Sequence, residues 1–78
     1  MPAHLTIEPT PDNIRYLYNL REKATLEINV SFTDRPSIYR AKSIRLTPDN
    51  WLGVYTDGEY RFPLATVIQL QVSIFIKR

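Results

Sequence analysis

The feature that most constrains the fold of this chain is a change in the spacing of its apolar residues near residue 24. Before this point they recur every three or four positions, as on one face of a helix, at Ile14, Leu17, Leu20 and Ala24. Within ATLEINVSFT (24–33) they instead alternate with polar residues, as in a strand with one buried face. We therefore predict a helix over about residues 11–23, followed directly by a strand.

The tetrapeptide TPDN occurs at 10–13 and again at 47–50, in different surroundings. The first copy precedes the helical pattern, where Thr10 suits the N-cap and Pro11 the first helical position. The second copy lies between a second predicted strand, SIYRAKSIRL, and the aromatic and β-branched run WLGVYT. Proline followed by Asp and Asn favours a turn. The same four residues are therefore predicted to begin a helix once and to close a hairpin once.

The remaining pattern indicates three more strands joined by short connections. In the second predicted strand the apolar positions change parity between Ala41 and Ile44, which predicts a bulge or bend near Lys42–Ser43. TDGE (56–59) favours a hairpin, and Pro63 favours a corner before a long final strand. We predict a mainly β fold, a small bent five-stranded antiparallel barrel with an N-terminal helix. It would form one domain over residues 10–78, preceded by a flexible tail over residues 1–9.

Composition excludes several classes of function. The 78 residues contain no cysteine and one histidine, His4, which argues against disulfides and a zinc site. No signal peptide or membrane-spanning stretch is evident, so we expect a cytoplasmic protein. No catalytic constellation or phosphate-binding glycine loop is present. We therefore expect no enzymatic activity and no cofactor.

A mixture of cations and aromatic residues is the functional signal that remains. It comprises Arg35, Tyr39, Arg40, Lys42, Arg45, Trp51, Tyr55, Tyr60 and Arg61. Cations bind phosphates and aromatic rings stack on unpaired bases, and small barrels combine the two to bind single strands. The alternative is that the rings belong to the core and the cations to a solvated face.

Several of these residues lie in short motifs that resemble the bacterial Sm-like proteins, the Hfq type of RNA chaperone. The resemblance runs from about Tyr16 to Val72. Leu20-Arg21 is similar to the end of the family's helix, and Ala41 stands where a small residue lets the second strand bend. Asp49-Asn50-Trp51 resembles the family's triplet of Asp, amide and aromatic residue at the start of the third strand.

The resemblance implies an Sm-like, or SH3-like, barrel that binds single-stranded RNA as a ring closed by edge-to-edge pairing of late strands. It implies that Trp51 stacks on bases and that Asp49 and Asn50 orient its loop. Tyr39 and Arg40 would lie on a second RNA surface. The predicted RNA-binding residues are Asp49, Asn50, Trp51, Tyr39, Arg40, Lys42 and Arg61.

One departure from the family's pattern and a second resemblance keep another hypothesis open. The family's late Tyr-Lys-His signature is replaced by Phe62-Pro63-Leu64. DGEYRFPLATVIQL also resembles the Rof type of Sm-like protein, which binds the termination factor Rho. The alternative is therefore a protein–protein interaction module without strong RNA binding. Under either hypothesis we expect a homo-oligomer, because Phe75 and Ile76 would be exposed in a monomer.

Overall fold

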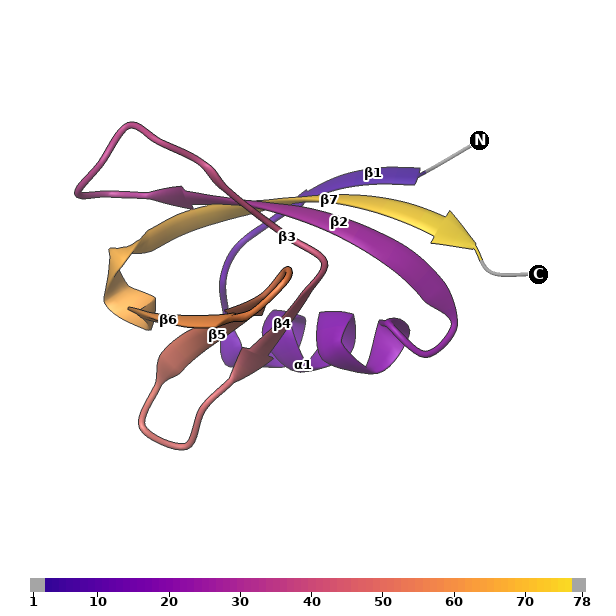
Figure 1. Ribbon diagram of the computed structural model, residues 1–78, viewed down its shortest axis with the longest axis horizontal. Coiled ribbons are helices and arrows are strands. Elements are labelled where there is room, and N and C mark those ends of the chain that lie inside the picture. The colour runs from indigo at the N-terminus through magenta and orange to yellow at the C-terminus, as the bar shows by residue number, and fades with distance from the viewer. Residues whose placement is uncertain (1–2, 77–78) are drawn as a thin grey trace.

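The computed structural model describes residues 3–76 and consists of two antiparallel sheets and one α-helix (Figure 1). The four-stranded sheet has the order β1-β7-β2-β3, and the three-stranded sheet has the order β4-β5-β6. The first sheet contains β1 (Ala3–Ile7), β2 (Ala24–Phe32), β3 (Tyr39–Ala41) and β7 (Val67–Ile76). The second contains β4 (Ser43–Leu46), β5 (Trp51–Tyr55) and β6 (Glu59–Pro63). The helix α1 spans Pro11–Leu20, and a 3₁₀ turn, η1, spans Leu64–Thr66.

The predicted fold class is confirmed in its coarse form, a mainly β chain of antiparallel strands with one helix near its N-terminus. The single five-stranded barrel is wrong, because the two sheets are separate and do not close. The cause lies at Lys42, whose N–H donates to the carbonyl of Tyr55 at 2.8 Å. The chain leaves the first sheet there and enters the second. The predicted strand 37–46 is thus divided into β3 and β4 at the predicted bend.

The N-terminal segment and the end of the helix also differ from prediction. Where a flexible tail was predicted over residues 1–9, Ala3–Ile7 forms β1 and pairs with β7; residues 1 and 2 lie outside the described part. Without β1, one edge of the long strand β7 would have unpaired backbone N–H and C=O groups. Pairing with β1 gives these groups hydrogen-bond partners. The helix ends at Leu20 rather than at residue 23, and a turn follows in which the Lys23 N–H donates to the Leu20 carbonyl at 2.9 Å.

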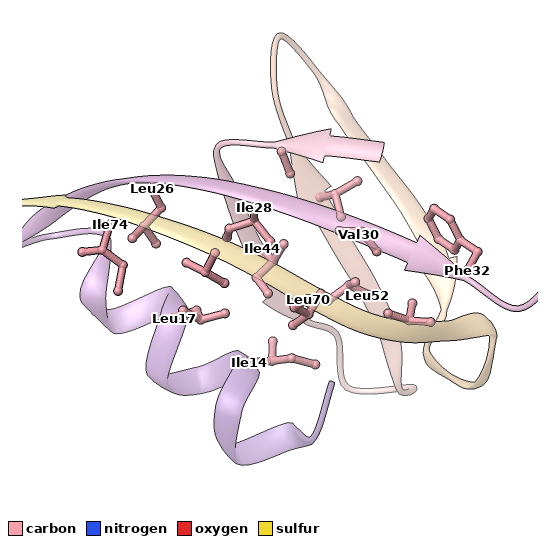
Figure 2. Packing of buried hydrophobic residues seen from close by; sticks show 14 of the residues in the cluster. Ile14, Leu17, Leu26, Ile28, Val30, Phe32, Ile44, Leu52, Leu70 and Ile74 are labelled. Carbon is pink, nitrogen blue, oxygen red and sulfur yellow. The ribbon is translucent and has the colours of Figure 1, made fainter. Parts of the chain in front are cut away.

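The core lies between α1 and the inner faces of the two sheets (Figure 2). The helix contributes Ile14 and Leu17, which are fully buried, and the half-buried Leu20. The alternating strand pattern places Leu26, Ile28, Val30 and Phe32 in the core as predicted. In β7 a shift in register beside Ser31 brings Val67 opposite Phe32. Val67 is therefore buried, whereas Ile68 is exposed.

Candidate functional site

Aromatic and basic side chains share the outer face of the three-stranded sheet. In β5 the side chains of Leu52 and Val54 are fully buried, so those of Trp51 and Tyr55 point to the opposite face. Arg45 of β4 and Arg61 of β6 lie opposite Gly53, and Glu59 lies opposite Tyr55. We call this surface the Trp51 face, defined by Arg45, Trp51, Gly53, Tyr55, Glu59 and Arg61.

The second TPDN positions Trp51 through a compact turn. Thr47 is buried, and its hydroxyl accepts a hydrogen bond from the Trp51 N–H at 2.9 Å and donates one to Asp49 Oδ1 at 2.6 Å. Asn50 has a φ of 63°, in the left-handed region that Asn tolerates better than most residues. These interactions hold the beginning of β5, and the Trp51 side chain remains 39% exposed.

The turn also affects the ionisation of Asp49. The hydrogen bond from the Thr47 hydroxyl holds the pKa of the Asp49 carboxyl below its ordinary value, with a smaller contribution from the positive charge of Arg61. Arg61 is thus close enough to influence this turn. Asp49 therefore remains ionised at neutral pH and supports the turn as an acceptor.

A single carboxylate links the polar groups of the Trp51 face. Glu59 Oε1 accepts a hydrogen bond from the Tyr55 hydroxyl at 3.0 Å and lies 3.6 Å from both Arg45 Nη2 and Arg61 Nε. Burial, followed by this hydrogen bond to Glu59, raises the pKa of Tyr55 above its ordinary value. Because the face contains two arginines and one glutamate, its net charge is positive.

A polar pocket lies beside the Trp51 face, between α1 and the turn that joins β4 to β5. Its volume is about 520 Å³, and its polar lining comprises Arg15, Tyr18, Asn19, Arg45, Thr47 and Asn50. Within the described part of the chain, Arg45 Nε is a buried donor without a hydrogen-bond partner. Buried donors are normally satisfied, so this atom is an exception to the usual pairing.

The sequence-predicted residues divide into three groups in the structure. Asp49, Asn50, Trp51 and Arg61 gather at or beside the Trp51 face. Tyr39 instead packs inward, with its ring centroid 5.6 Å from those of both Tyr60 and Phe62. The remaining two, Arg40 and Lys42, line a different groove beside the first residues of β2.

The pocket residues on the helix were missed by the sequence interpretation. Arg15, Tyr18 and Asn19 have the spacing of neighbours on one helix face, which was the available signal. That α1 packs beside β4 depends on tertiary structure and could not be derived from this spacing.

Residues 3–76 contain no cluster of His, Asp and Glu side chains that could hold a metal ion. The same part of the chain has no helix of sufficient length and apolarity to cross a membrane. Comparison with protein-family models gave no matching family, and comparisons with curated proteins and with solved structures gave no significant match.

Proposed function

We propose that the protein is a non-enzymatic Sm-like protein that binds single-stranded RNA on the Trp51 face, as a post-transcriptional regulator or RNA chaperone. The observation that carries the proposal is the position of Trp51, an exposed ring with an arginine on each neighbouring strand. The order of elements supports the resemblance. If β3 and β4 are counted as one strand bent at Lys42, α1 is followed by five strands, with β1 as an addition.

The Trp51 face offers the two interactions that sequence-tolerant binding of single strands requires. Its exposed indole provides a stacking surface, which contributes about 1–3 kcal/mol per base in such sites. Arg45 and Arg61 occupy diagonal positions relative to Trp51 on the flanking strands, where long side chains can reach the same ligand. Their guanidinium groups suit the phosphates on either side of a stacked base.

The polar pocket extends this surface toward α1. Arg15 and Arg45 supply positive charge there, and Asn19 and Asn50 supply amide donors and acceptors. A strand whose base stacks on Trp51 would therefore continue into this pocket.

Glu59 opposes RNA binding in this arrangement. Its carboxylate lies 3.6 Å from both arginines, so a phosphate must compete with it for their guanidinium groups. This predicts that Glu59→Gln, which removes the negative charge, strengthens RNA binding. Reduced or unchanged affinity in that variant would contradict the role of the two arginines.

The proposed homo-oligomer is favoured by exposed apolar side chains near the end of β7, since Phe75 is 39% and Ile76 74% exposed. The strands available for pairing differ from those first expected. β1 and β2 occupy the two edges of β7, so β7 could pair with another copy only if β1 left it. Pairing between copies would instead use an end strand, namely β1, β3, β4 or β6, or the part of β2 that extends beyond β3.

The test is titration with short U-rich and A-rich RNAs at two salt concentrations, following Trp51 fluorescence and the anisotropy of labelled RNA. We expect salt-dependent binding that quenches Trp51. Trp51→Ala should weaken binding by about 5- to 150-fold, the loss of one stacked base. Tyr16→Ala is the matched control, because Tyr16 is an exposed ring on α1. Unchanged affinity in a folded Trp51→Ala variant would overturn the proposed site.

A further inference from the structure

One edge of β2 is left open over its first residues. β7 pairs with β2 from Ala24, opposite Ile76, to Phe32. On the other edge β3 pairs only with residues 28–30, because the chain turns into the second sheet at Lys42. Within residues 3–76, no strand therefore pairs with this edge over residues 24–27. Figure 1 shows the first part of β2 extending beyond the corner where β3 meets β4.

A groove of about 590 Å³ follows this open edge, and we call it the edge groove. Residues 24–27 of β2 form one side, and the β3–β4 corner with Thr56 forms the other. Arg21, Arg40 and Phe75 complete the lining. Ala24, Leu26 and Ala41 are 1%, 3% and 1% exposed, so their side chains are almost fully covered, whereas the ring of Phe75 is 39% exposed.

The backbone of this edge determines which kind of ligand fits. In a strand, the N–H and C=O groups of successive residues point alternately to its two sides. Two of the four residues 24–27 therefore direct both groups away from β7, toward the edge groove. A regular series of donors and acceptors matches another extended polypeptide, and exposed sheet edges bind peptides in this way.

The charges around the groove select among peptides. Arg15, Arg21, Arg35, Arg45 and Arg61 each lie within 3.0–3.6 Å of a carboxylate. Among the Lys and Arg side chains of residues 3–76, those without an ion pair are Lys23, Arg40 and Lys42. Arg40 and Lys42 line the groove, Lys23 directly precedes Ala24, and Glu27 is the one acid in the lining. The groove therefore carries a net positive charge that is not neutralised within the described chain.

We propose that the edge groove binds an extended acidic peptide segment, which adds a strand to β2 beside residues 24–27. Backbone hydrogen bonds would provide the affinity. Arg40 and Lys42 would select for acidic side chains, and the exposed ring of Phe75 would contact apolar side chains of the peptide. The site lies on a different sheet from the Trp51 face, so it does not depend on RNA binding there.

The probe is a labelled peptide of alternating glutamate and valine, about eight residues long, a typical strand length. We expect saturable binding that weakens with salt. Amide hydrogen exchange of the ¹⁵N-labelled protein should then show added protection at two alternate residues among 24–27. The other two amides of this segment point toward β7 and should not change. The same peptide, N-methylated at alternate backbone positions, should not bind.

Lys42→Glu should weaken peptide binding about tenfold, as should Arg40→Glu. Arg15→Glu, which makes the same charge change on α1, should leave it unchanged. Equal binding of a lysine–valine peptide, binding without alternate amide protection, or no binding at low salt would each overturn the proposal. A U-rich RNA could displace the peptide, and Lys42→Glu could weaken the binding of that RNA as much as it weakens peptide binding. Both results together would make the groove a nucleic-acid site. That result would likewise overturn it.

Discussion

The two copies of TPDN have the same sequence, yet their threonines bind backbone N–H groups at different distances along the chain. Thr10 caps α1, and its hydroxyl oxygen accepts from the Asn13 N–H at 3.2 Å. Thr47 accepts from the Trp51 N–H at 2.9 Å, one residue further on. The residues after each tetrapeptide decide between these outcomes, because an apolar stripe buried at Ile14 and Leu17 follows the first. An alternating strand follows the second.

The two asparagines show the same contrast. Asn13 lies in the helix, and its side-chain Nδ2 donates to the Glu8 carbonyl at 3.0 Å. Asn50 has a φ of 63°, and its backbone N–H donates to the Thr47 carbonyl at 3.1 Å. The first copy therefore begins an element that covers the core. The second reverses the chain and sets the position of Trp51 on an exposed surface.

The largest single loss of stability is expected on removal of the Thr47 hydroxyl from the second copy. Thr47→Val deletes the acceptor of the Trp51 N–H and the donor to Asp49 in a buried position. Leaving such groups unpaired costs about 1–3 kcal/mol, so we expect a loss of about 2 kcal/mol. Thr10→Val removes one N-cap bond, which typically costs about 1 kcal/mol. Urea unfolding of both variants measures the difference.

Thr47→Ser is the control for that pair, since it retains the hydroxyl and removes the methyl group. It should be more stable than Thr47→Val. Equal losses in Thr10→Val and Thr47→Val would mean that the buried turn contributes no more than an ordinary helix cap. In that case the comparison between the two copies would fail.

A smaller loss of stability than that of Thr47→Val is expected at the asparagines. Asn50→Ala places alanine in the left-handed region, which costs about 1–2 kcal/mol, whereas Asn50→Gly should retain stability because glycine adopts this conformation without a Cβ clash. Asn13→Ala should change the free energy of unfolding by less than about 0.5 kcal/mol, as is usual at the surface. If Asn50→Gly and Asn50→Ala lost equal stability, backbone conformation would not be the reason for Asn50.

Local patterns predicted much of this fold, because α1, β2, β5 and β7 each carry their own periodicity. β1 was missed although AHLTI alternates apolar and polar residues, because five residues are a weak signal and the partner strand is far away in the chain, as in Ala3 opposite Ile74. The bend near Lys42 was evident from the change in parity. The division into two sheets was not, since it depends on the hydrogen bond from Lys42 to Tyr55.

The candidate site was predictable to a similar extent. Asp49, Asn50 and Trp51 are adjacent in the chain, so one motif indicated all three. Arg61 and Arg45 join them through strand register across Gly53, which follows from the two hairpins. Tyr39 has a partly buried, inward position that composition alone could not separate from an exposed one. The open edge of β2 likewise required the structure, because it results from where β3 ends.

The smallest expected difference concerns the aspartates. Asp12 of the first copy pairs with Arg15 at 3.0 Å, outside the tetrapeptide. Asp49 of the second copy accepts a hydrogen bond from Thr47 of the same copy, and this hydroxyl lowers the pKa of the Asp49 carboxyl below its ordinary value. A pKa lowered on folding means that the folded state binds the proton less tightly than the unfolded state. The stabilisation from Asp49 is therefore complete above its unfolded pKa and is lost as pH falls through the lowered value.

Thr47→Val should raise the pKa of Asp49 toward its ordinary value and reduce the loss of stability on acidification. Carboxyl ¹³C titration by NMR measures this directly. Asp34 provides an internal control, because its pKa is lowered mainly by a hydrogen bond from Arg35 and should be the same in the variant. An unchanged Asp49 pKa in Thr47→Val would show that the hydroxyl is not its cause. The backbone hydrogen bond of Asp49 and, to a smaller extent, the charge of Arg61 would then account for the lowered pKa.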